Sequence, residues 1–389
     1  MRIPLGLYVH MPWCVRKCPY CDFNSHQLRS PTPDPSYIDA LIRDFEAELP
    51  RCRGRRIDSV FFGGGTPSLF RPEEFDRLLG ALRDRAQLAA DAEITLEANP
   101  GTIERGRFDG YREAGINRVS LGAQSFSAPA LEALGRIHSV DDTCRAVEEL
   151  RAAGLDNFNL DLMYALPGQS LEQAIEDVRR ACDLQPAHIS YYQLTLEPGT
   201  VFHERPPELP DEESSWRIQC AGQRMLADAG YAQYEVSAYA RAGSRCRHNL
   251  NYWRFGDYVG IGAGAHGKVS LSLPGEIVRT VKPKQPREYL ARAAGERAAA
   301  WGEAVAVAAA DLPFEFMLNA LRLNEGFDLD DYRERTGLEW DSIEAGIRRA
   351  EARGLLTKGE KGWKPTELGL RFLNDLQASF LPDPPSLRV

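Results

Sequence analysis

The sequence predicts an α/β protein: a partial (β/α)6 TIM-like barrel, then a linker region, then a C-terminal winged-helix-like α+β module. Three observations support this. Short apolar segments alternate with amphipathic segments over nearly 200 residues, polar or glycine-rich turns follow the apolar segments, and the pattern becomes mostly helical from Asp311 onward. We therefore divide the chain into a barrel over residues 1–236, a linker region over 237–310 and a C-terminal module over 311–389.

Six apolar segments are predicted to be strands, with helical patterns between them. The strands are expected at 5–10, 57–62, 93–97, 117–121, 157–161 and 187–192, and the helices at 36–49, from Pro72, up to Gly115, at 140–154 and at 170–184. Such alternation indicates a parallel sheet of βα units. The pattern alone does not separate an open barrel from a flat doubly wound sheet. The position of the unusual residues favours the barrel, because they follow strand ends, where barrel enzymes build their sites.

The second half of the chain is less regular. A helix is expected over 211–229, a short strand over 234–236, a turn-rich stretch over 260–266 and, because alanine is abundant, a helical connector over 291–310. From Asp311 we expect three helices, a strand over 355–358, a turn over 359–362 and a final helix from Thr366. This order is typical of a winged-helix module.

Composition excludes several classes of protein. Charged residues make up 26% and apolar residues 43%, which is typical of globular chains. The net charge is −9, and residues 311–389 hold more acidic than basic side chains, so we expect no nucleic-acid partner. No apolar run is long enough for a membrane span, and five of the eight cysteines are scattered singly. These features, with no signal-peptide pattern at the N-terminus, predict a cytoplasmic protein.

Three cysteines stand close together directly after the first predicted strand. Cys14, Cys18 and Cys21 are separated by three and then two residues. Clustered thiolates bind soft metals and suit an iron–sulfur cluster, which normally takes four cysteines. A site with only three protein ligands leaves one position open for chemistry. Half of a zinc site, or three unrelated thiols, is the alternative.

The C-x3-C-x2-C spacing, with Tyr20 before the last cysteine, resembles the signature of radical S-adenosylmethionine (SAM) proteins. The resemblance implies a [4Fe-4S] cluster held by these three thiolates, with SAM at the fourth iron. It also implies cleavage of SAM to a 5′-deoxyadenosyl radical.

Further residues match the SAM pocket of this family, especially its coproporphyrinogen-oxidase branch. Gly64, Gly65 and Thr66 lie in a Gly-Gly-Gly-Thr-Pro turn that resembles the element binding the SAM amino group, and Glu97 ends a strand where it can accept the ribose hydroxyls. The resemblance places four others in or near the same pocket, and Arg is suited to the SAM carboxylate. These are Tyr8, Gln124, Arg136 and Asp161, with Tyr20 packed near the adenine. Taken singly, Glu97 would be read as a surface glutamate and the glycines as an ordinary turn.

The resemblance narrows to haem-chaperone members of the branch and to the oxygen-independent coproporphyrinogen III oxidase. The oxidase carries a fourth cysteine where this chain has Phe23, and it has a long extension before the tyrosine that corresponds to Tyr8. The segment from His248 to Trp253 matches the H-N-x-x-Y-W motif of the chaperone type. A radical SAM enzyme with another substrate is a third interpretation. No catalytic residue is assigned.

The chaperone interpretation makes haem a cofactor and a partner. His248 is the candidate axial ligand, and Cys246 is a second candidate. On the alternative view, His248 caps a loop and Trp253 belongs to the core. The resemblance implies a haem-accepting protein, respiratory and membrane-associated, and an electron donor for the cluster. Dimer formation is left open.

Overall fold

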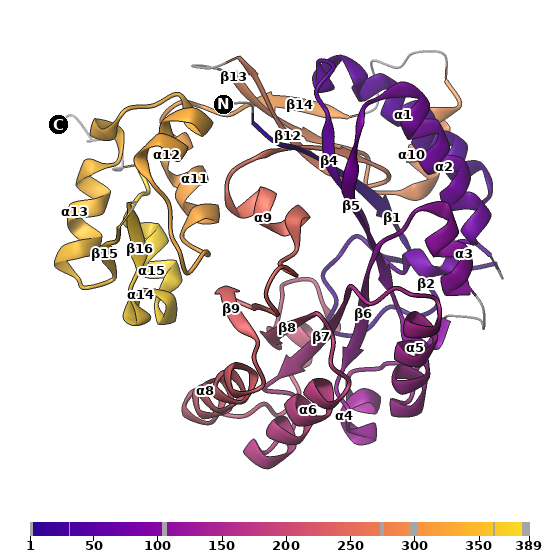
Figure 1. The fold of residues 1–389 in the computed structure, drawn as a ribbon, viewed down its shortest axis with the longest axis horizontal. Coiled ribbons are helices and arrows are strands. Elements are labelled where there is room, and N and C mark those ends of the chain that lie inside the picture. Colours follow the sequence, from indigo (N-terminus) through magenta and orange to yellow (C-terminus); the bar gives the residue numbers. More distant parts are fainter. Residues whose placement is uncertain are drawn as a thin grey trace.

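Six parallel strands form the centre of the molecule and follow one another in chain order (Figure 1). The computed structural model describes residues 3–30, 32–102, 107–272, 276–295, 302–360 and 362–382. The central strands are β1 (Leu5–Met11), β4 (Ile57–Gly64), β5 (Leu88–Ala98), β6 (Arg118–Gln124), β7 (Phe158–Tyr164) and β8 (His188–Gln193). The residues of β1, β6 and β7 are almost all buried, as expected for strands inside a parallel sheet that other elements cover on both faces.

The strand order decides between the two topologies that the sequence left open. In a doubly wound sheet the order reverses at a switch point. Here each central strand pairs with the next one along the chain, from β1 to β8. The ends do not join, because β1 pairs on its other side with β11 (Asp257–Ile261) and β8 with β10 (Ala238–Ala240). The predicted partial barrel is therefore confirmed.

Further strands extend this sheet at both edges. β9 (Ala232–Glu235) follows β10, while β12 (His266–Ser272), β13 (Glu276–Val281) and β14 (Glu303–Ala306) follow β11. The helical connector expected over 291–310 is wrong where it is described. α10 (Pro286–Ala293) ends early, and 303–306 pair with β13 instead, because the open backbone groups of a sheet edge outweigh alanine's helix propensity. Residues 296–301 lie outside the described part.

Helices cover the convex side of the curved sheet (Figure 1). They are α1 (Ser36–Cys52), α2 (Pro72–Arg85), α3 (Arg107–Ala114), α4 (Ala128–Ala133), α5 (Val140–Ala152), α6 (Leu171–Asp183) and α8 (Glu212–Asp228). The 3-10 turns η1 (Pro67–Leu69) and η2 (Pro100–Thr102) and the short helix α7 (Val201–Glu204) follow β4, β5 and β8. Ser139 and Ser170 cap α5 and α6. A short helix, α9 (Arg247–Trp253), lies on the other side and contacts β1, β4 and β11.

The C-terminal part has its own apolar core. It contains α11 (Leu312–Ala320), α12 (Leu329–Thr336), η4 (Trp340–Ser342), α13 (Glu344–Ala352), β15 (Leu356–Lys358), β16 (Trp363–Pro365), α14 (Glu367–Arg371) and α15 (Leu373–Ala378). The three helices and the strand β15 are as predicted. The second strand of the wing, β16, was not predicted, and the last helix is divided at Phe372. Phe255 and Ile277 join this core, so it packs on the end of the sheet region. The boundaries at 236 and 310 remain predictions.

Two further observations concern the chain as a whole. Among the described residues, no helix combines the length and apolarity needed to cross a bilayer. All eight cysteines are unpaired thiols.

Candidate functional site

A cavity opens where the central strands end, and it gathers most of the predicted site residues. We call it the rim cavity. Eleven of the predicted residues line it: Cys14, Cys18, Tyr20, Cys21, Gly64, Gly65, Thr66, Glu97, Gln124, Arg136 and Asp161. The C-terminal ends of parallel strands meet at one edge of a sheet, so residues far apart in sequence converge there. Ser25, Ser120 and Tyr192 also line the cavity and were not predicted.

Each of the three clustered cysteine sulfurs lies within hydrogen-bond distance of a polar side chain. Thr66 Oγ1 donates to Cys14 Sγ at 3.4 Å, and Arg136 Nη1 lies 3.9 Å from Cys18 Sγ as its donor. Ser25 Oγ and Cys21 Sγ are 3.7 Å apart. Burial raises the pKa of Cys14 and Cys21, and their hydroxyl partners oppose that rise. Cys14 and Cys18 thus have donors directed at their sulfurs, and the Ser25 hydroxyl is close enough to donate to a Cys21 thiolate, as suits metal ligands.

The glycine turn after β4 is tied to the cysteine loop by backbone hydrogen bonds. Gly65 N donates to Met11 O at 2.8 Å, and Thr66 N donates to Trp13 O at 2.7 Å. A Cβ atom on Gly65 would lie 2.6 Å from Trp13 O, and Gly64 has a φ of +114°. Only glycine allows this close approach and this backbone conformation. The turn therefore positions both the cysteine loop and one wall of the rim cavity.

Two carboxylates face the rim cavity from neighbouring parts of the sheet. Glu97 accepts a hydrogen bond of 3.1 Å from Gly64 N, and burial, with a smaller effect of the Asp161 charge, raises its pKa to about 7. Asp161 accepts hydrogen bonds from Asn159 at 2.7 Å and from Ser120 at 3.3 Å, and burial raises its pKa. Neither carboxylate forms an ion pair among the described residues. Such groups can accept hydrogen bonds from ligand hydroxyls.

Arg136 and Gln124 complete the cavity wall. Arg136 Nη2 donates to Gly122 O at 2.9 Å, but its Nε is buried and has no partner among the described residues. Gln124 has a φ of +66°, which is rare for a residue with a side chain, and it accepts a hydrogen bond of 2.7 Å from the Tyr192 hydroxyl. An unpartnered buried donor and a strained backbone both indicate a site built for a ligand.

These residues fit the groups that the cysteine spacing predicts. In the part of the chain that is described, no three His, Cys, Asp or Glu side chains are arranged around a single ion. A [4Fe-4S] cluster does not require that, because each thiolate binds a different iron. Beside the three sulfurs, an orphaned Arg136 donor and the carboxylates of Glu97 and Asp161 match the carboxylate and ribose hydroxyls of SAM.

A second cavity shares a wall with the first. We call it the adjacent cavity. Both cavities are lined by Phe23, Ser25, Gly64 and Glu97. The other residues of the adjacent cavity do not line the rim cavity. They are Tyr8, His10, Lys17, Asp22, Asn24, His26, Tyr252, Tyr258, Gly264, His266 and Lys284. Tyr8 therefore lies next to the rim cavity rather than in it, with its hydroxyl bonded to His10 Nδ1 at 2.9 Å.

His248 and Cys246 lie outside both cavities. His248 is buried on α9, with Nδ1 bonded to Ser59 Oγ at 2.9 Å and Nε2 to the Tyr252 hydroxyl at 3.0 Å. The carboxylate of Glu93 accepts hydrogen bonds from the first backbone amides of α9 and from the Cys246 thiol. Burial lowers the pKa of His248 to about 3. Its assignment as a haem ligand stays a prediction, and binding iron would require one of the two ring hydrogen bonds to break.

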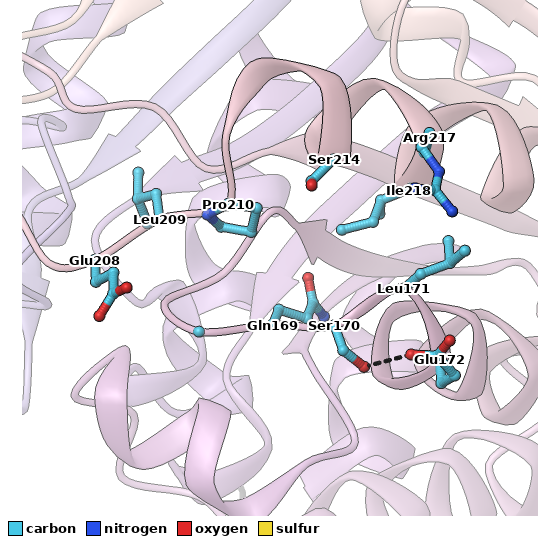
Figure 2. Close-up of a pocket in the computed structure, with 11 residues that line it drawn as sticks. Gln169, Ser170, Leu171, Glu172, Glu208, Leu209, Pro210, Ser214, Arg217 and Ile218 are labelled. Carbon is cyan, nitrogen blue, oxygen red and sulfur yellow. Dashed lines mark hydrogen bonds between the residues drawn. The ribbon is translucent and has the colours of Figure 1, made fainter.

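A third cavity lies at the N-terminal ends of α6 and α8, and Figure 2 shows its lining. Ser170 Oγ donates there to Glu172 Oε2 at 2.9 Å, and Arg217 lies on the opposite side. Its lining residues lie between positions 168 and 218, and no predicted site residue lies in that range. It is therefore separate from the predicted site.

Comparison with known proteins identifies the family of this chain. Residues 8–181 match the family model of the radical SAM superfamily, and residues 307–372 match the HemN C-terminal domain. The chain is 49% identical over 378 residues to the Heme chaperone HemW of Escherichia coli (strain K12), covering 97% of this chain and 98% of that protein. It is 34% identical to the mouse Radical S-adenosyl methionine domain-containing protein 1, mitochondrial, covering 97% and 87%.

A solved structure shows the same fold. The coproporphyrinogen III oxidase HemN of Escherichia coli superimposes with a TM-score of 0.82 at 24% identity, covering 97% of this chain and 90% of that one. The chain therefore belongs to the radical SAM superfamily and, within it, to the coproporphyrinogen-oxidase-like family that contains the HemW proteins.

Proposed function

We propose that this protein is a haem chaperone that holds a [4Fe-4S] cluster and SAM, binds haem and passes it to an acceptor protein. The observation that carries the proposal is the 49% identity, over almost the full length of both chains, to a protein named Heme chaperone HemW. The rim cavity supports the part that concerns the cluster and SAM. When bound, these two groups supply one-electron chemistry.

The residues of the rim cavity have separate roles in this proposal. Cys14, Cys18 and Cys21 hold the cluster. The Arg136 guanidinium binds the SAM carboxylate, and Glu97 accepts the ribose hydroxyls. Gly64 and Gly65 have no side chains, so the ligand can approach their backbone. Their turn also packs closely against His10 and Trp13, where a Cβ atom would not fit. Tyr20 forms an apolar wall with Phe202, at 6.4 Å between ring centroids.

Haem transfer is a ligand exchange and needs no electron. The bond between the haem iron and a side chain of this protein breaks, and a bond to a side chain of the acceptor forms. We propose a respiratory, membrane-associated haem protein as the acceptor and a separate electron donor that sets the redox state of the cluster. We propose that haem transfer takes place in the cytoplasm, where the eight thiols stay reduced. Size-exclusion chromatography of the same reconstituted protein tests whether two copies associate.

The oxygen-independent coproporphyrinogen III oxidase is the second candidate, and the fold match to HemN favours it. Against it stands Phe23, at the position where the oxidase carries a fourth cysteine. The Phe23 ring is 63% exposed, at the wall that the two cavities share.

The deciding experiment uses anaerobically reconstituted full-length protein in two assays. The first is a haem titration followed by mixing with a haem-free b-type acceptor, with the two proteins separated afterwards. The second is incubation with coproporphyrinogen III, SAM and a reductant. Haem binding and its movement to the acceptor, without decarboxylation, are expected. Decarboxylation of coproporphyrinogen III without haem binding would replace the chaperone by the oxidase.

A further inference from the structure

The adjacent cavity offers the chemistry that a haem requires, and it borders the rim cavity. The shared wall of Gly64 and Glu97 means that a ligand in one cavity lies next to a ligand in the other. Three histidines line the adjacent cavity, and they differ in how much of each ring is already bonded.

In His10 both ring nitrogens already form hydrogen bonds. Its Nδ1 is bonded to the Tyr8 hydroxyl and its Nε2 to Asn24 O at 2.9 Å. His26 is partly used, because its Nε2 is shared between Asn24 Oδ1 at 3.2 Å and Lys284 O at 3.3 Å. The exposed His266, at the start of β12, has no hydrogen-bond partner for its ring among the described residues. It is therefore the imidazole best able to bind a metal without losing an existing bond.

The position of His266 is set by the tertiary structure. The Asn24 amide donates to Ala263 O and to Lys284 O, both at 2.9 Å. These bonds tie the segment after the cysteine loop to the β11–β12 turn and to the segment after β13. Lys282 N donates to Ala265 O, next to His266. These hydrogen bonds hold the backbone that carries His266 beside the cysteine loop.

Two lysines supply positive charge at the same cavity. Lys17 lies in the cysteine loop, where its Nζ donates to Phe23 O at 3.2 Å, and Lys284 follows β13. Both are exposed and line the cavity. Asp22 and Glu97 are the acidic groups of the lining. Lysines near an open cavity can pair with the carboxylates of a bound molecule.

Aromatic rings form the remaining wall. Tyr8, Tyr252 and Tyr258 line the cavity, and Tyr252 and Tyr258 meet edge to face at 4.4 Å between centroids. With Phe23 they provide flat apolar surface for a planar ring system. A planar molecule with a central metal and two carboxylates matches the three kinds of group that line this cavity.

We propose that haem binds in the adjacent cavity, with His266 as the iron ligand and with Lys17 and Lys284 paired with its propionates. This inference rests on the proposed function, since it places the haem of that proposal. His248 then has a positioning role, because its Nε2 holds the hydroxyl of Tyr252, whose ring lines the cavity. His248 also stacks on Phe61 at 5.1 Å, and Phe61 stacks on Tyr8 at 6.3 Å. It thus supports two aromatic walls without touching the haem.

The test is a haem titration of anaerobically reconstituted full-length protein, followed by absorption and electron paramagnetic resonance spectra. His266→Ala is compared with His26→Ala, His248→Ala and His203→Ala, the last an exposed histidine on α7 outside the cavity. His266→Ala is expected to weaken haem binding by about tenfold or more and to change the spectrum, with added imidazole restoring it. His203→Ala should keep the wild-type affinity and spectrum. Loss of the ligand signature in His26→Ala and not in His266→Ala would instead assign the iron to His26.

The outcomes separate this inference from the proposed function. If wild type binds haem and His266→Ala binds it with unchanged affinity and spectrum, the ligand assignment is overturned and the chaperone remains. If His248→Ala loses the ligand signature and added imidazole restores it, while His266→Ala keeps it, the iron ligand is His248 and the assignment is overturned. If wild type does not bind haem, the proposed function itself fails.

The lysines give an independent measurement that does not involve the iron. Lys17→Ala and Lys284→Ala should each weaken haem binding by about two- to fivefold at low salt, and the difference from wild type should shrink at high salt. Lys364→Ala, at an exposed lysine of β16, is the matched control. Equal affinities for all three variants at low salt would contradict the pairing with the propionates.

Discussion

The backbone amide of Gly64 donates a hydrogen bond of 3.1 Å to the carboxylate of Glu97. This bond joins the glycine turn after β4 to the end of β5, and both residues line the rim cavity and the adjacent cavity. Glu97 thus stands between the two proposed ligands, and its protonation state affects both sides. Its raised pKa makes this testable.

Glu97→Gln should remove a pH-dependent loss of stability. Burial raises the pKa of Glu97 from its ordinary value to about 7, so the folded protein holds this proton more tightly than the unfolded chain does. The resulting stabilisation is complete below the ordinary pKa and is lost as pH rises through 7. Between pH 5 and pH 8 wild type should therefore lose up to roughly 3 kcal/mol of unfolding free energy that Glu97→Gln does not lose.

Urea unfolding of SAM-free protein at both pH values measures this difference. Glu113→Gln, at an exposed glutamate of α3, is the control and should track wild type. A Glu97→Gln curve parallel to wild type from pH 5 to pH 8 would show that Glu97 is charged throughout that range.

Thr66→Val should lower the reduction potential of the cluster while the cluster still assembles. Thr66 donates to Cys14 Sγ, and a hydrogen bond to a ligand sulfur stabilises the more negative, reduced state. Its loss should shift the potential downward, on the order of tens of millivolts. A redox titration monitored by electron paramagnetic resonance gives the value. Thr95→Val changes the same groups at a buried threonine of β5 and should leave the potential unchanged.

Arg136→Met should weaken SAM binding. The Arg136 Nε is buried without a partner in the described part of the protein, and a charge-assisted hydrogen bond contributes roughly 1.5–3 kcal/mol. The dissociation constant for SAM should rise by about 10- to 100-fold. Calorimetry on protein with equal iron and sulfide content measures it, because Arg136 also contacts Cys18.

Arg180→Met serves as the control for this measurement. Arg180 donates to Phe126 O and does not line the rim cavity. If Arg136→Met binds SAM as wild type does, the guanidinium does not contact the ligand.

Lys282→Met should strongly destabilise the fold. The buried Lys282 ammonium pairs with Asp44 at 2.6 Å and Glu48 at 2.7 Å, and so joins the segment after β13 to α1. Removing the cation leaves the buried Asp44 carboxylate without a partner charge among the described residues, while Glu48 keeps Arg51 at 2.8 Å, and breaking such a buried pair costs about 3–5 kcal/mol. Urea unfolding at pH 7 measures the loss. Lys284→Met, two residues further on and exposed, should change stability by less than about 0.5 kcal/mol.

The rim cavity was largely predictable because its residues follow the ends of consecutive parallel strands. Cysteine spacing identified Cys14, Cys18 and Cys21, and the strand pattern placed Glu97 and Asp161 at the same edge of the sheet. Both inferences use spacing along the chain. Neither required knowledge of contacts between distant segments.

The adjacent cavity could not be predicted in this way. His26 and His266 are separated by 240 residues, and they share a cavity because β11 pairs with β1 and Asn24 binds both later segments. No spacing in the chain reports that pairing. The packing of His248 is similar: its motif was visible, but its bonds to Ser59 and its cap by Glu93 come from the barrel strands.

The sequence by itself determined the alternation of strands and helices, the C-terminal module and the cysteine loop, because hydrophobic periodicity and short-range spacing encode local structure. Only the tertiary structure decided between a partial barrel and a doubly wound sheet, made 303–306 an edge strand, and showed which histidine rings are already bonded. The physical reason is that these features depend on hydrogen bonds between segments far apart in the chain. Such bonds exist only once the sheet has formed.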